Sequence, residues 1–170
     1  MNHIYHYLPS DPTQYTIETI ANVVFKETNS VSDYEEVLKM FIFDALIGNH
    51  DRHGRNIALI ETVKGKRLAP LYDNPSYLGL ESGEILNAHF APKSLIWTKH
   101  SKEPLMQECL FELERINAGH VVNIFYENVS IETIIESINA SHSLSDLMKS
   151  ALRRLIVDRF DALEEHVKNR

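Results

Sequence analysis

The sequence predicts a mainly α-helical domain that carries one small β-hairpin. Apolar residues recur at helical spacing before residue 48 and again after residue 104. Between these regions, two short apolar runs flank the tight turn Val63-Lys64-Gly65-Lys66, a pattern typical of a hairpin. No internal repeat or long linker divides the chain, so we expect a single domain over residues 1–170.

Two helices are predicted ahead of the hairpin. Apolar residues at helical spacing predict an amphipathic helix over roughly 14–26. Ser32 and, three residues later, Glu35 form a capping box that predicts the start of the second helix. Gly48 is expected to end that helix, because glycine readily adopts the left-handed conformation required just past a helix. The first ten residues are assigned no structure.

The hairpin is predicted from residues 56–60 and 67–72, with Pro70 making the second strand an edge strand or a bulged one. A turn centred between Lys64 and Gly65 places Asn56 opposite Asp73. Directly opposed residues lie about 4.5–5.5 Å apart.

Such a register would bring an amide oxygen and a carboxylate to one end of the hairpin. Both are oxygen ligands of the kind that magnesium prefers. Asp51, which precedes the first strand, would stand beside Asn56 and Asp73. The spacing of these three residues therefore predicts a magnesium site next to a proton acceptor.

After the hairpin, residues 76–101 are expected to be irregular, and the remainder over 102–168 to be helical. A helix is predicted from Pro104 to Gly119. Ser130 is expected to cap a short helix through Ile138. Ser143 and Asp146 resemble a cap for a final helix through about residue 167.

Composition narrows the classes of partner. The net charge is −7 and no long cluster of lysine and arginine occurs, which argues against direct binding of nucleic acid. The apolar runs are too short to span a membrane. A single cysteine, Cys109, fits a reducing cytoplasm, where we expect it to be a small buried hydrophobe.

The segment Ile47-Gly-Asn-His-Asp-Arg-His-Gly-Arg-Asn56, followed by Leu68-Ala-Pro-Leu-Tyr-Asp73, is similar to the catalytic loop and metal-site strand of HipA-like kinases. It also resembles the catalytic loop of phosphatidylinositol kinases. Those lipid kinases usually carry Asp-Phe-Gly at the second metal site, whereas this chain has Asp73-Asn74-Pro75. The resemblance to the HipA-like kinases is therefore preferred.

This resemblance implies a protein-kinase-like C-terminal lobe in which residues 47–75 form the catalytic loop and metal-site hairpin. Asp51 would be the catalytic base, and Asn56 and Asp73 would bind magnesium. Asn49 and His53 would shape the loop and complete the cofactor-binding set. The implied activity is ATP- and Mg2+-dependent phosphoryl transfer to a serine or threonine of a protein substrate, by a toxin kinase of a toxin–antitoxin system.

The sequence also departs from a complete kinase. None of its six glycines forms the glycine-rich loop that covers ATP phosphates, and no strand-rich region precedes residue 47. We therefore expect the N-terminal lobe to be absent. The chain would be a fragment, a split subunit that needs a separate N-lobe or antitoxin polypeptide, or a relative that acts as a non-catalytic interaction module or pseudokinase.

Two further alternatives stay open at this point. Gly48-Asn49-His50-Asp51 matches one element of calcineurin-like phosphoesterases, and its last two residues match the doublet of HD phosphohydrolases, so a metal-dependent phosphohydrolase is the less favoured reading. Arg52 and Arg55 could either steer phosphates or be solvated loop charges.

Overall fold

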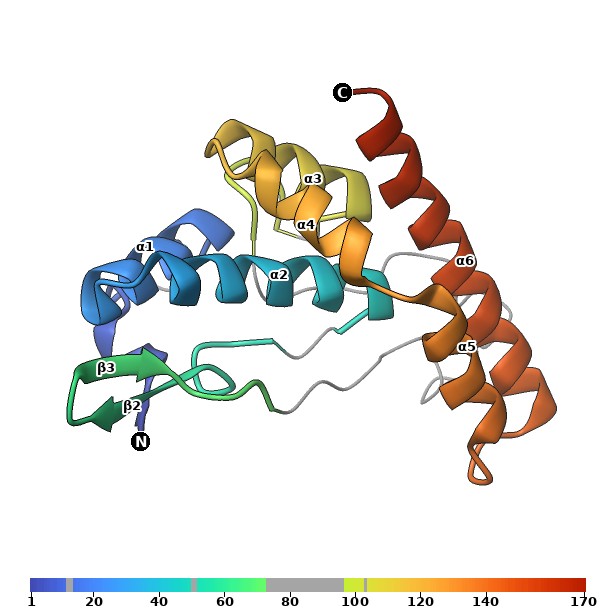
Figure 1. The fold of residues 1–170 in the computed structure, drawn as a ribbon, viewed down its shortest axis with the longest axis horizontal. Coiled ribbons are helices and arrows are strands. Elements are labelled where there is room, and N and C mark those ends of the chain that lie inside the picture. Colours follow the sequence, from blue (N-terminus) through green and yellow to red (C-terminus); the bar gives the residue numbers. More distant parts are fainter. Residues whose placement is uncertain (12–13, 50–51, 73–96, 103) are drawn as a thin grey trace.

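The computed structural model describes residues 1–11, 14–49, 52–72, 97–102 and 104–170. Its described part is mostly helical and includes a small antiparallel sheet, which confirms the predicted fold class (Figure 1). In chain order the elements are β1 (Asn2–His3), the short 3-10 helix η1 (Ile4–Tyr7), α1 (Ile17–Thr28), α2 (Val31–Ile47), β2 (Ala58–Thr62), β3 (Gly65–Leu68), α3 (Met106–Arg115), α4 (Gly119–Asn128), α5 (Ile131–Ala140) and α6 (Asp146–Lys168).

Helix α2 is the centre of the molecule. The hairpin β2–β3 lies on one side of it, α3 and α4 lie on the other, and α5 and α6 pack near its C-terminal end (Figure 1). This central place explains why α2 is apolar around most of its circumference, since a helix with neighbours on several sides must be apolar on several sides. Its fully buried side chains include Val37, Leu38, Ile42 and Leu46.

The start of α2 differs from the prediction. Ser30, not Ser32, is the N-cap residue, because its hydroxyl oxygen accepts the Asp33 N–H at 3.2 Å. The predicted capping box was therefore two residues too late. The predicted end is correct: Gly48 follows the helix with φ of 73°, in the left-handed region that glycine adopts without steric cost.

The hairpin forms, but its predicted register was wrong. Leu59 pairs with Leu68 and Thr62 pairs with Gly65, so each β2 residue faces a residue two positions earlier than predicted. Gly65, with φ of 114°, begins β3 instead of lying inside the turn. The Thr62 hydroxyl donates to the Gly65 carbonyl at 2.7 Å and closes this shorter turn. β3 is an edge strand and ends before Pro70, as the proline indicated.

A strand that the sequence did not predict completes the sheet. β1 pairs antiparallel with the other edge of β2, with Asn2 opposite Leu59, so the order is β1-β2-β3. The N-terminal segment is thereby held against the start of the hairpin.

The helices after residue 104 were predicted in part. The helix predicted from Pro104 to Gly119 ends earlier, at Arg115, and Asn117 follows it with a φ of 60°. Gly119, which was expected to end a helix, begins α4 instead. Ser130 caps α5 as predicted, its hydroxyl accepting the Thr133 N–H at 3.1 Å. Ser145, and not Ser143, caps α6.

Cys109 is buried as expected, and burial raises the pKa of its thiol to about 12. In the described parts of the chain, no helix combines the length and the apolar character needed to cross a membrane.

Candidate active site

The predicted catalytic loop begins at the C-terminal end of α2. The N–H groups of Gly48 and Asn49 both donate to the backbone carbonyl of Asp44, the latter at 2.8 Å. These bonds satisfy a carbonyl in the last turn that would otherwise lack a helical partner. The chain therefore leaves the helix in a defined direction.

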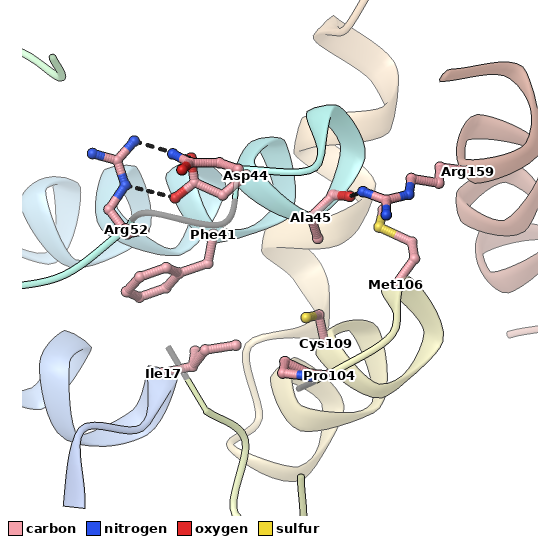
Figure 2. Close-up of a pocket in the computed structure, with 10 residues that line it drawn as sticks. Ile17, Phe41, Asp44, Ala45, Arg52, Pro104, Met106, Cys109 and Arg159 are labelled. Carbon is pink, nitrogen blue, oxygen red and sulfur yellow. Dashed lines mark hydrogen bonds and ion pairs between the residues drawn. The ribbon is translucent and has the colours of Figure 1, made fainter. Parts of the chain in front are cut away.

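The Asp44 side chain is the centre of a buried polar network below the loop. Its Oδ2 accepts from Nε of Arg52 at 2.7 Å, and its Oδ1 accepts from Nη2 of Arg52 at 2.9 Å and from Nδ2 of Asn49 at 2.8 Å (Figure 2). All three residues are buried, with Arg52 at 0% exposure. Burial raises the pKa of the Asp44 carboxyl, and the bonds from Arg52 and Asn49 oppose that shift.

Arg52 also joins the two ends of the hairpin. Its Nη1 donates to the backbone carbonyl of Asn56 at 3.1 Å and to that of Tyr72 at 3.0 Å. The two carbonyls are therefore neighbours although the strand ladder does not extend to them. Both expectations for Arg52 were wrong, since a buried guanidinium with a carboxylate partner is neither a solvated charge nor a group presented to an incoming phosphate.

The predicted site residues fall into two groups. Asp51 and Asp73 lie outside the described residues. Asn49, His53 and Asn56 are described, and they belong to one continuous loop fastened to α2 by Asp44 and Arg52. The Asn56 N–H donates to the His53 carbonyl at 2.9 Å, and Asn56 is 4% exposed. This bond and the burial of Asn56 hold the residue in place.

The His53 side chain contacts the backbone of its own loop. Its Nδ1 accepts the backbone N–H of Arg55 at 3.2 Å, which turns the loop toward β2.

The N-terminal segment supports the loop from outside. The Tyr5 N–H donates to the Gly54 carbonyl at 2.9 Å, and the Arg55 guanidinium lies 5.4 Å from the centre of the Tyr5 ring. A Cβ on Gly54 would stand 3.2 Å from the Tyr5 Cα, a tight contact, so glycine eases the close approach of the two segments. The Tyr72 hydroxyl donates to the Arg55 carbonyl at 2.9 Å and also contacts Nδ1 of His3 at 3.2 Å. Arg55 itself is exposed, and its guanidinium lies over the Tyr5 ring.

We did not predict a role for Asp44 from the sequence, although its position among apolar residues is unusual. It stands in the middle of an otherwise apolar helical segment, between Phe41 and Leu46. A charged residue inside a buried stripe is rarely tolerated without a partner, which identifies it as a member of a polar network. The partner could not be chosen from the sequence, because several arginines are available.

The described residues fit a magnesium site only in part. No group of three His, Cys, Asp or Glu side chains in the described ranges could hold a metal ion. The amide oxygen of Asn56 is a ligand type that magnesium accepts, and its neighbour across Arg52 is Tyr72, the residue covalently followed by Asp73.

Comparison with known proteins decides the family. A family model for the HipA-like C-terminal domain matches residues 1–122. The chain belongs to the HipA-like C-terminal domain family. The resemblance inferred from the loop residues is thereby confirmed. Among curated protein sequences, none matches the chain.

Solved structures of the same fold support this assignment. The crystal structure of a Helicobacter pylori proinflammatory kinase, CtkA, superposes with a TM-score of 0.70 at 16% identity, covering 91% of this chain and 61% of that one. HipA of Shewanella oneidensis MR-1, solved with HipB and operator DNA as a toxin–antitoxin system, gives a TM-score of 0.61 at 15% identity, covering 90% of this chain and 36% of that one. The HipA-like chain therefore spans less than two thirds of the length of either protein.

Proposed function

We propose that this chain is the catalytic lobe of a HipA-like kinase, which transfers the γ-phosphoryl group of ATP to a serine or threonine hydroxyl of a protein substrate. The observation that carries the proposal is the double contact of Arg52 with the Asn56 and Tyr72 carbonyls. It brings the predicted metal asparagine beside the residue that precedes the predicted metal aspartate, in a chain of kinase-related family.

In the proposed reaction, Asp51 accepts the proton of the attacking hydroxyl, whose oxygen forms the new bond to the γ-phosphorus as the bond to the ADP oxygen breaks. Asn56 and Asp73 would hold magnesium, which when bound would supply positive charge to neutralise the phosphates. Asn49 and His53 keep the loop in shape through Asp44 and the Arg55 N–H. The buried network below the loop keeps these groups in place without reorganisation during the reaction.

A second polypeptide segment is part of the proposal. Covering ATP requires a glycine-rich loop and a lysine that this sequence does not supply in the usual pattern. We therefore propose that a separate N-lobe or an antitoxin-type protein completes the nucleotide site. HipA of Shewanella oneidensis MR-1 was solved in complex with HipB, so a protein of similar fold does bind a separate polypeptide.

The test is magnesium-ATP binding by calorimetry, with the chain alone and with a candidate N-lobe. We expect weak binding alone, tighter binding with the N-lobe, and loss of both in the double variant Asn56→Ala/Asp73→Ala. The matched control is Asn128→Ala/Asp158→Ala, which removes the same two side-chain types from exposed sites on α4 and α6. Binding that survives the Asn56/Asp73 double variant would refute the proposed metal site.

An assay of phosphoryl transfer distinguishes the kinase hypothesis from the hypothesis of a non-catalytic module. With the N-lobe present, we expect transfer of the γ-phosphoryl group to serine or threonine, and its loss in Asp51→Asn with magnesium-ATP binding retained. Binding without any transfer in the wild-type chain would favour the pseudokinase alternative.

A further inference from the structure

Arg159 is a buried arginine whose position the proposed reaction does not explain. It lies on α6, is 9% exposed, and donates from Nη1 to the backbone carbonyl of Ala45 (Figure 2). Ala45 belongs to the last turn of α2, where carbonyls lack partners within the helix. The arginine therefore caps the helix from which the catalytic loop departs.

The charges around Arg159 explain why a cation is stable there. Burial lowers the pKa of Arg159 to about 10, so the guanidinium remains charged at neutral pH. The C-terminal end of a helix carries partial negative charge, which a cation stabilises. No carboxylate from the described residues forms an ion pair with Arg159. The end of α2 is thus the negative group that this buried charge meets.

The capped turn is also the one that holds the loop. Ala45 directly follows Asp44, whose backbone carbonyl accepts the Gly48 and Asn49 N–H groups and whose side chain binds Arg52. One cavity of about 30 Å3 is lined by Arg159 together with Asp44, Asn49 and Arg52, among others. This volume admits a water molecule or two but no larger ligand, so Arg159 and the loop network line one small cavity whose other walls are mainly apolar.

We propose that Arg159 is a positioning residue for the catalytic loop, acting through the last turn of α2. The inference rests on the proposed function for the meaning of that loop. It assigns part of the active-site geometry to α6, a helix that lies beyond residues 1–122 matched by the family model. Loss of the guanidinium would leave the Ala45 carbonyl without its cap and loosen the turn that holds Gly48 and Asn49.

Hydrogen exchange tests this without requiring activity. The rate at the Gly48 and Asn49 amides is divided by the rate at the Ala69 amide, which donates to Ala58 in the hairpin at 2.8 Å. In Arg159→Met we expect this ratio to rise about tenfold, as a cap of roughly 1.4 kcal/mol would give. Arg159→Lys, which keeps the charge, should restore most of the wild-type ratio.

The control is Arg154→Met, which removes an arginine from an exposed position of the same helix. It should leave the ratio unchanged. If Arg159→Met does not fold, Arg159→Gln replaces it and should raise the ratio by a smaller factor. An unchanged ratio in the Arg159 variants would overturn the proposal, because Arg159 would then support only overall stability.

Kinetics separates this inference from the proposed function. If the wild-type chain with its N-lobe shows no transfer, the proposed function fails while the exchange result stands. If transfer occurs, we expect Arg159→Met to lower kcat with little change in the KM for ATP, and Arg159→Lys to recover kcat. A raised KM with unchanged kcat would contradict a positioning role.

Discussion

Helix α2 carries two aspartates that bind arginines in the same paired geometry but in different surroundings. Near its start, Asp33 accepts from Nε and Nη2 of Arg67 at 2.8 and 3.0 Å. Near its end, Asp44 accepts from the same two atoms of Arg52 at 2.7 and 2.9 Å. The Arg67 side chain is 52% exposed, whereas that of Arg52 is 1% exposed.

Because the surroundings differ, the two pairs are expected to contribute differently to the free energy of unfolding although their hydrogen-bond geometry is similar. Asp33 lies in the first turn, where the partial positive charge of the helix end favours a carboxylate, and it also accepts the Leu68 N–H at 3.2 Å. Asp44 lies in the last turn, where the helix end opposes a carboxylate. It therefore depends on Arg52, while Asp33 would keep favourable contacts without Arg67.

The largest effect is expected from Arg52→Met. This change leaves the buried Asp44 carboxylate without its cation and removes the Arg52 bonds to the Asn56 and Tyr72 carbonyls, so we expect a loss of about 3–5 kcal/mol in the free energy of unfolding. Urea denaturation followed by circular dichroism measures it.

The control for that prediction removes both charges. Arg52→Met combined with Asp44→Leu should recover part of the loss, because no isolated charge remains buried. A double variant less stable than Arg52→Met alone would show that the pair, and not the isolated carboxylate, accounts for the cost.

Arg67→Met should have a smaller effect. The half-exposed guanidinium is already solvated, and Asp33 keeps its bond from the Leu68 N–H. We expect the loss to be well below that of Arg52→Met and to shrink as sodium chloride is raised from 0.05 to about 0.5 M, since screening acts on exposed pairs.

Lys39→Met is the matched control for salt dependence. It removes a cation from the surface pair with Glu36 on the same helix, which lies at 2.8 Å. The change should alter unfolding by less than about 0.5 kcal/mol. If the loss in Arg67→Met were independent of salt, the contrast between the buried and exposed pairs would be wrong.

A third carboxylate, Glu112 on α3, gives the smallest expected effect, confined to acid pH. Burial raises its pKa, but the bonds from Arg115 and from the Lys99 N–H outweigh burial and hold the pKa below the ordinary value of 4.5. The folded state thus binds fewer protons, so this stabilisation is complete above about pH 4.5 and is lost as the pH falls below it.

Glu112→Gln checks this dependence. The stability gap between wild type and variant should be constant from pH 6 to 7 and narrow below about pH 4.5, as measured by thermal unfolding across the pH series. A gap that widens in acid would reverse the assigned direction of the shift.

Local features of the site could be predicted from the sequence where a residue type strongly favours one backbone conformation. Gly48 ends α2 because few other residues tolerate a φ of 73°. The family was likewise recognisable from residues 47–56 and 68–73. The hairpin register was not, because moving Gly65 from the turn into β3 shifts all pairs by two while leaving every side chain on the same face.

The buried network could not be predicted from the sequence for a different reason. Asp44, Arg52 and Arg159 are far apart in the chain, and their pairing depends on how α2, the loop and α6 pack. A charged residue in an apolar stripe predicts that a partner exists without identifying it. Arg52 was therefore assigned to solvent or phosphate, although its Nη1 joins the two ends of the hairpin.

The two aspartate–arginine pairs constrain both the length and the rotation of the part of α2 that lies between the aspartates. Asp33 and Asp44 lie eleven positions apart, about three full turns, so both carboxylates emerge from the same side. Inserting or deleting one residue between them would rotate one carboxylate by about 100° relative to the other. A change of chain length that keeps both aspartate–arginine pairs is therefore better placed in an exposed turn, such as the one at Val63, than within α2. The length of α2 between the two aspartates fixes the distance between the hairpin and the loop.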